Sequence, residues 1–282
     1  MDLFSESEDQ NRKTSIGNCL IEYKKASSIL TPASGFMSSY DFTLNPYSGC
    51  SFGCTYCYAA FFSRSEEQRN NWGLWLQVKE NALSLIKKYR NKGLRNKIIY
   101  MSSVTDPYQP IEKEMEITRS ILKELLEYHQ PRLVIQTRSP IVLRDIDLLS
   151  RFQNIQVNMT ITTDSEKVRK IFEPLCPSND SRIKAIKEIN DAGIKSCITM
   201  TPLLPVLDPE SFAIKLKNTG LTNFIIQPFH TEKGKFIAGT RSAAMNLIKE
   251  LDWTDEKYKM TEEILLNHIP NLGIGKEGFK PI

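Results

Sequence analysis

Three cysteines within eight residues are the feature of this sequence best suited to chemistry. Cys50, Cys54 and Cys57 have the spacing Cys-x3-Cys-x2-Cys. Zinc sites normally close with four ligands, whereas three thiolates on a four-iron cluster leave one iron without a protein ligand. An open metal position is kept where another molecule must bind. The spacing therefore favours an iron–sulfur cluster with one open position. A zinc knuckle completed by a distant cysteine and three cysteines of an apolar core are the alternatives.

Composition and charge are those of an ordinary globular protein. The 282 residues are 40% apolar and 25% charged, and 37 basic against 33 acidic side chains give a net charge of +4. This net charge neither excludes nucleic acid as a partner nor indicates it. No apolar run approaches the ~20 residues of a membrane helix, and residues 1–13 lack the apolar region of a secretory signal. We therefore expect a cytoplasmic protein with reduced cysteines and no membrane partner.

Short β-rich runs alternate with amphipathic helical patterns along the chain. One pattern has apolar residues spaced by three and four, as on one face of a helix: Trp75, Val78, Ala82, Leu85 and Tyr89. Alternating strands and helices predict a parallel sheet, either doubly wound or part of a (β/α) barrel. In both architectures, ligands bind at the C-terminal ends of the strands. The predicted strands are 41–44, 97–102, 132–137, 155–161, 196–201 and 223–227.

We divide the chain into three parts. Residues 1–39 form an N-terminal tail and lead-in, and residues 40–234 form an α/β core of six strand–helix units. Residues 235–282 form a short helical C-terminal extension, with helices over 241–250 and 255–267. A Gly-x-Gly-x-x-Gly motif at 273–278 is interpreted as a loop, because the pattern predicts neither the preceding strand nor the following helix that a dinucleotide site requires.

Several segments outside the cysteine motif are also distinctive. They are Leu44-Asn45-Pro46-Tyr47-x-Gly-Cys50, Cys54-x-x-Cys57-Tyr58-Ala59, Val104-Thr105-Asp106-Pro107-Tyr108-Gln109-Pro110, Thr137-Arg138-Ser139 and Phe172-Glu173-Pro174. Over about residues 30–205 the chain resembles the radical S-adenosylmethionine (SAM) superfamily, in its spore photoproduct lyase-like (DNA repair photolyase-like) branch. We therefore expect a radical SAM core folded as a partial (β/α)6 barrel of the TIM type with parallel strands.

The resemblance implies a [4Fe–4S] cluster on the three cysteines, SAM at the open iron, and Tyr56 near the SAM adenine. Such an enzyme cleaves SAM reductively, and the 5′-deoxyadenosyl radical then abstracts a hydrogen atom from the substrate. A reductant such as flavodoxin or ferredoxin supplies the electron. The substrate is unknown, and a nucleobase lesion or modification is one candidate. The alternative function is a non-catalytic iron–sulfur electron carrier or scaffold.

Polar residues at the ends of the predicted strands are candidates for binding SAM. Asp106 follows the second strand, and a carboxylate accepts well from the SAM amino group, although Asp106-Pro107 also makes a turn. Arg138 stands where the branch commonly has a lysine near the SAM carboxylate; it keeps the charge but differs in geometry. Threonine is also common in strands without any binding role, and this is the alternative interpretation of the threonine candidates. The other candidates are Thr105, Ser139, Thr160 and Thr162.

A hydrogen-atom donor to the product radical would be a further catalytic group. Spore photoproduct lyases use a cysteine in that way, and Cys197 lies in the fifth predicted strand on the same face as Thr199. A small apolar filler is the alternative interpretation of Cys197. The spacing of Cys19, Cys176 and Cys197 does not indicate a second cluster.

Three other polar residues lie near the predicted site. Glu173 and Arg182 are expected to form a structural pair, with framing of the pocket as the alternative. His230 follows the sixth predicted strand and is the histidine best placed to reach a substrate.

Overall fold

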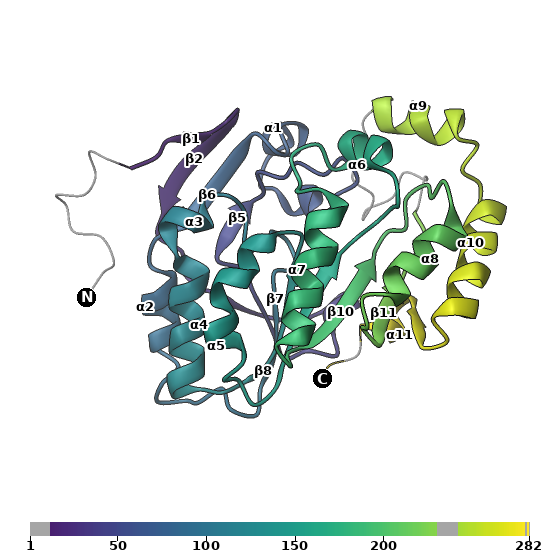
Figure 1. Ribbon diagram of the computed structural model, residues 1–282. Helices are drawn as coiled ribbons and strands as arrows, with labels where there is room; N and C mark the ends of the chain where they lie inside the picture. Colours follow the sequence, from purple (N-terminus) through teal and green to yellow (C-terminus); the bar gives the residue numbers. More distant parts are fainter. Residues whose placement is uncertain (1–11, 230–241, 280, 282) are drawn as a thin grey trace.

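The computed structural model describes residues 12–229, 242–279 and 281 (Figure 1). Residues 1–11 of the predicted N-terminal tail and lead-in lie outside the described residues, and so does His230. Within the described ranges, no helix has both the length and the apolar character needed to cross a membrane.

An eight-stranded sheet forms the centre of the protein. Six parallel strands follow one another in chain order, and each matches a predicted strand to within one residue at either end. An antiparallel strand, β3 (Leu30–Pro32), flanks β4, and a parallel strand, β12 (Leu272–Ile274), flanks β11. Since β3 and β12 are the two edges of this sheet, the barrel is partial. The six strands are β4 (Phe42–Leu44), β7 (Ile98–Met101), β8 (Arg132–Thr137), β9 (Ile155–Thr160), β10 (Lys195–Met200) and β11 (Asn223–Ile226).

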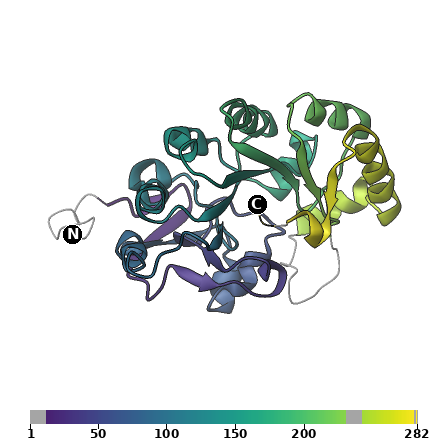
Figure 2. The ribbon, with the colours of Figure 1, turned by 90° about the horizontal axis from the view of Figure 1, so that it is seen from below.

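Helices cover the outer side of this curved sheet and form an arc around the strands when the molecule is viewed from below (Figure 2). In α4 (Ile117–Tyr128), residues Ile117, Ile121 and Leu125 are buried at spacings of four, so the helix packs one apolar stripe against the sheet. In α8 (Pro209–Lys217), Asp208 caps the first turn by accepting from the Ser211 amide. The other helices of this layer are α2 (Ala82–Lys87), α3 (Glu112–Met115), α5 (Ile146–Leu149) and α7 (Asn179–Asp191).

Shorter elements connect these units and carry the loops of the site. They are the 3₁₀ helices η2 (Gly35–Met37), η3 (Tyr58–Phe62) and η4 (Pro140–Asp145), and the α-helices α1 (Glu66–Asn70) and α6 (Glu166–Phe172).

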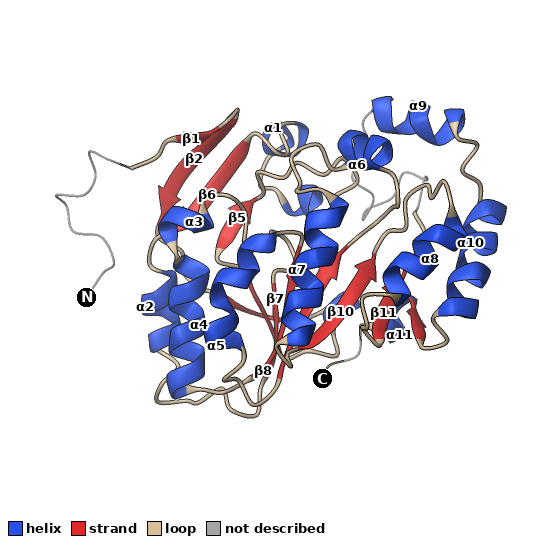
Figure 3. Ribbon diagram, viewed as in Figure 1, coloured by secondary structure: helices blue, strands red, loops and turns tan. Residues whose placement is uncertain are grey.

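A second, four-stranded sheet was not predicted from the sequence. Its strands pair in the order β1 (Ser15–Ile16), β2 (Cys19–Lys24), β6 (Trp75–Lys79) and β5 (Tyr47–Gly49) (Figure 3). Because β5 runs directly into Cys50, this sheet fixes the start of the cysteine loop.

The predicted helical face from Trp75 to Tyr89 was wrong in its first part. Residues 75–79 form the strand β6, and the helix α2 begins only at Ala82. Burial alternates along β6, where Leu76 and Val78 are buried and their neighbours are half-buried. This is the two-residue period of a strand. The spacing of three between Trp75 and Val78 imitated a helix because a bulky half-buried tryptophan was counted as part of the apolar face.

The C-terminal part contains the two predicted helices, α9 (Ser242–Glu250) and α10 (Asp255–His268). The prediction of a loop at 273–278 was wrong, because the end of β12 and the helix α11 (Gly275–Gly278) form this segment. Strand β12 extends the main sheet, so the segment after 234 contributes more than helices. With four residues, α11 is too short to be the crossover helix of a dinucleotide-binding unit.

Replacing Gly73 by alanine is expected to destabilise the protein more than replacing Gly93. Both glycines have positive φ angles, +98° and +66°, a conformation that costs an L-residue about 1–2 kcal/mol. A Cβ at Gly73 would also lie 2.7 Å from the Cα of Gly53 in the cysteine loop, whereas one at Gly93 would meet nothing within 4 Å. We expect Gly73→Ala to lose about 2 kcal/mol more in urea unfolding. Equal losses for the two variants would contradict this close approach.

Candidate active site

The three motif cysteines lie in one loop that follows β5. Cys50 and Cys54 are buried in a cluster with Phe52 and Trp72, and Cys57 packs against the same cluster. At Gly49 the loop presses against β6, because an added Cβ would lie 2.6 Å from the carbonyl oxygen of Trp75. The thiols are therefore gathered on a closely packed loop.

The loop after β7 holds the cysteine loop in place. Thr105 Oγ1 donates to the Gly49 carbonyl oxygen at 2.6 Å. Gln109 Oε1 accepts from both the amide and the hydroxyl of Ser51, at 2.9 and 3.1 Å. Thr105, predicted to bind SAM, thus makes its bonds to the cysteine loop.

Asp106 connects two of the loops at the C-terminal edge of the sheet. One carboxylate oxygen accepts from Thr137 Oγ1 and from the Tyr108 amide, and the other accepts from the Arg138 amide, at distances of 2.8 to 2.9 Å. Burial raises the pKa of Asp106, and these bonds oppose the rise. The carboxylate therefore makes the predicted turn and also fixes the backbone at Arg138.

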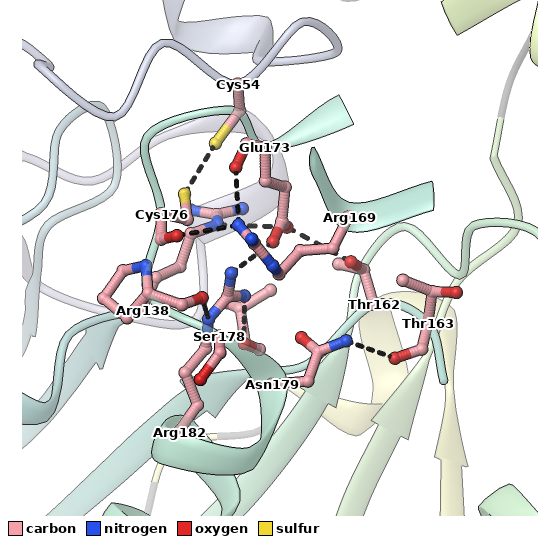
Figure 4. A network of polar contacts seen from close by, with 12 residues as sticks. Cys54, Arg138, Thr162, Thr163, Arg169, Glu173, Cys176, Ser178, Asn179 and Arg182 are labelled. Carbon is pink, nitrogen blue, oxygen red and sulfur yellow. Dashed lines mark hydrogen bonds and ion pairs between the residues drawn. The ribbon is translucent and has the colours of Figure 1, made fainter. Parts of the chain in front are cut away.

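Three predicted SAM-binding residues converge on one carboxylate, that of Glu173. Tyr56 donates its hydroxyl to Glu173, and Thr162 Oγ1 donates at 3.2 Å. Arg138 Nη2 donates to the Tyr56 hydroxyl at 3.1 Å, and Arg138 Nε lies 3.5 Å from Glu173 Oε1. Residues from the cysteine loop and from the ends of β8 and β9 are thereby brought to one point (Figure 4).

Glu173 and Arg182 form the predicted pair at the centre of this network. Arg182 Nη2 lies 2.6 Å from Glu173 Oε2, and both side chains are fully buried. Burial alone would raise the pKa of Glu173, but the guanidinium groups of Arg182 and Arg138 outweigh it and lower the pKa to about 2. The carboxylate is thus ionised, and two arginines facing one glutamate leave an excess of positive charge.

A fourth cysteine, Cys176, lies beside the motif. Its Sγ is 3.6 Å from Cys54 Sγ (Figure 4), and it belongs to the same buried cluster as Cys50 and Cys54. Cys176 was not predicted to lie here, because no local pattern links two residues 122 positions apart. Its only signal is its place two residues after the Phe172-Glu173-Pro174 segment.

The side chains of three predicted residues are placed elsewhere, although the backbone carbonyl oxygen of Thr160 accepts from Arg182 Nη1 at 3.0 Å. Ser139 accepts from the Ile141 amide and caps η4. Thr160 Oγ1 accepts from Gln136 Nε2 at 2.7 Å. Cys197 is buried in a different apolar cluster, and burial raises its pKa to about 12. The role of Cys197 as a hydrogen donor stays a prediction.

The thiol donors of the cysteine loop fit an iron–sulfur cluster. Among the residues that the structure describes, no group of three or more His, Cys, Asp or Glu is arranged to hold one metal ion. Buried thiols are soft ligands suited to iron–sulfur clusters, and the neighbouring arginines would offset the negative charge of such a cluster.

Comparison with known proteins agrees with this geometry. A family model described as the radical SAM superfamily matches residues 44–214. An uncharacterized protein of Methanocaldococcus jannaschii is 41% identical over 183 residues, which are 65% of this chain and 68% of that protein. A protein of Pseudomonas phage M6 named radical SAM Nalpha-GlyT isomerase is 26% identical over 161 residues, 57% of this chain and 32% of that protein.

The fold is also similar to solved structures. A spore photoproduct lyase mutant with bound AdoMet and dinucleoside spore photoproduct superposes with a TM-score of 0.59 and 16% identity, over 90% of this chain and 81% of that chain. At this identity the likeness concerns the fold.

The ionised Glu173 is expected to make stability depend on pH. Its folded-state pKa of about 2 lies below the ordinary 4.5, so its contribution is complete above pH 4.5 and is lost as the pH falls to 2. We expect Glu173→Gln, which leaves Arg182 unpaired, to be about 3 kcal/mol less stable than the wild type at pH 6, with this gap narrowing below pH 4.5. Chemical unfolding at several pH values measures both.

The control is Glu250→Gln, which removes an exposed carboxylate paired with Lys167. It is expected to change the free energy of unfolding by less than about 1 kcal/mol. A gap between wild type and Glu173→Gln that stayed constant from pH 6 to pH 2 would contradict the ionised pair.

Proposed function

Because the chain belongs to the radical SAM superfamily, we propose that it cleaves SAM reductively at a [4Fe–4S] cluster and uses the resulting 5′-deoxyadenosyl radical to abstract a hydrogen atom from its substrate. The observation that carries this proposal is the convergence of Tyr56, Arg138 and Thr162 on Glu173, beside Cys54. An electron carrier or scaffold would need the cysteines but no polar network next to them. The network therefore favours an enzyme.

Cys50, Cys54 and Cys57 would hold the cluster, and the loop after β7 supports them. Thr105 and Gln109 bind the backbone of the cysteine loop from the loop after β7. Such supporting hydrogen bonds hold a metal-binding loop in one geometry, so that the ligands are positioned before the cofactor binds.

Arg138 is the residue that we assign to the SAM carboxylate. Its side chain is 18% exposed, whereas that of Arg182 is fully buried against Glu173. Arg138 is therefore the more accessible of the two arginines, and a guanidinium binds a carboxylate through paired charge-assisted hydrogen bonds. Asp106 acts through Arg138 as a positioning residue, because it fixes the Arg138 amide and the preceding Thr137 hydroxyl.

The substrate class that we favour is a nucleobase or a nucleobase lesion. Support comes from the structural neighbour that was solved with a dinucleoside spore photoproduct. Fold likeness alone does not fix a substrate. The electron would come from a small reductant such as flavodoxin or ferredoxin.

Reductive cleavage of SAM is the direct test of this proposal. We expect the protein, loaded anaerobically with iron and sulfide and reduced with dithionite, to convert SAM into 5′-deoxyadenosine and methionine, detected by chromatography. Cys54→Ala should abolish both products. An intact cluster whose EPR signal does not change on adding SAM would contradict the proposal and favour an electron carrier.

Replacing Arg138 tests the assigned SAM site. Hydrogen bonds to charged groups contribute about 1.5–3 kcal/mol, so we expect Arg138→Ala to weaken SAM binding to the cluster-loaded protein by roughly tenfold to a hundredfold, measured by calorimetry. Arg138→Lys keeps the charge but loses the paired geometry, and its loss should be smaller. The control is Arg151→Ala, an exposed arginine before β9, at the opposite end of the sheet. Unchanged SAM affinity in Arg138→Ala would remove Arg138 from the site.

A further inference from the structure

Cys176 is a buried thiol for which the proposed SAM chemistry has no use. Its sulfur lies 3.6 Å from that of Cys54, a proposed cluster ligand. The two remaining cysteines outside the motif belong to other parts of the core, Cys19 to the large central cluster and Cys197 to the cluster around Tyr100. Cys54 thus has one particular non-motif cysteine as its neighbour.

Backbone contacts hold these two sulfurs together. The Thr55 amide, next to Cys54, donates to the Phe172 carbonyl oxygen at 2.8 Å. On the other segment, the Cys176 amide donates to the Glu173 carbonyl oxygen at 3.1 Å, and Arg169 Nη1 donates to the Cys176 carbonyl oxygen at 2.7 Å. Both ends of the contact are therefore anchored, and the two thiols are positioned by the fold (Figure 4).

We propose that Cys54 and Cys176 are a site of oxidative modification, and form a reversible disulfide when the protein lacks its cluster and meets a peroxide. Hydrogen peroxide oxidises one thiol to a sulfenic acid and releases water; the second thiol then attacks that sulfur and releases a second water. Two thiols thus lose two electrons and two protons, and one peroxide becomes two waters. Formation of an S–S bond of about 2.05 Å requires the sulfurs to approach by about 1.5 Å, within reach of a side-chain rotation.

The disulfide would protect Cys54 from further oxidation and would mark a protein that lacks its cluster. A disulfide cannot proceed to the irreversible sulfinic acid without first being broken, and Cys54 cannot ligate iron while it is bonded to Cys176. Cluster loading would then require prior reduction by a dithiol. This regulatory consequence rests on the proposed function, in which Cys54 is a cluster ligand, whereas formation of the disulfide does not.

The sequence makes this disulfide straightforward to map. Trypsin cuts after Lys25 and Arg64, which places all three motif cysteines on the peptide 26–64, and after Lys170 and Arg182, which places Cys176 on the peptide 171–182. The full chain, freed of iron with a chelator, is treated with one equivalent of hydrogen peroxide, alkylated and digested. We expect the two peptides linked, two hydrogen atoms lighter than their sum, with fragmentation placing the bond at Cys54. Dithiothreitol should release both peptides.

Matched variants separate this pair from general thiol oxidation. Cys197→Ser, which changes another buried cysteine, should keep the linked peptides. Cys176→Ser should lose them and, when a second equivalent of peroxide is added, accumulate sulfinic acid at Cys54. After treatment with peroxide and then dithiothreitol, the wild type should regain the visible absorption of the cluster on reconstitution, and Cys176→Ser should not.

Two results would overturn the proposal. One is a wild-type map in which Cys54 remains alkylated or becomes a sulfinic acid without any link to Cys176. The other is linkage of Cys176 to Cys50 or Cys57 as often as to Cys54. Both come from the wild-type chain, so they hold even where a variant fails to fold. Absence of SAM cleavage, by contrast, would count against the proposed function and would leave the peptide map unchanged.

Discussion

The ionised carboxylate of Glu173 constrains the candidate site more than any other group. A fully buried charge is tolerated only when it is paired and hydrogen-bonded, and here the partners come from distant parts of the chain. Tyr56 belongs to the cysteine loop, Arg138 to the loop after β8, and Arg182 to α7. Satisfying one charge therefore fixes three segments relative to one another. The same pairing leaves a net positive charge beside thiols that would carry negative charge as cluster ligands.

The sequence was sufficient to predict the repeating part of the fold. The six central parallel strands were predicted because buried β-branched runs, turn residues and helical patterns agreed locally, whereas the parallel edge strand β12 was not predicted. The roles of individual site residues were less predictable, because they depend on which loops meet. Asp106 has all its bonds within the protein, and the strand ends show its position but not its partners. The strand at 75–79 was missed because its apolar spacing also fits a helix. The position of Cys176 was missed because its contact with Cys54 joins residues far apart in the sequence.

The contact between the cysteine loop and residues 172–176 has a consequence for how the protein is made. Cys50, Cys54 and Cys57 are synthesised early, yet the amide of Thr55 and the hydroxyl of Tyr56 find their partners only at Phe172 and Glu173. On the ribosome, the three thiols therefore emerge well before the segment that encloses them, and non-local contacts of this kind form late in folding. A cell that loads the cluster has a long interval in which the cysteines are accessible to iron delivery and equally to oxidants.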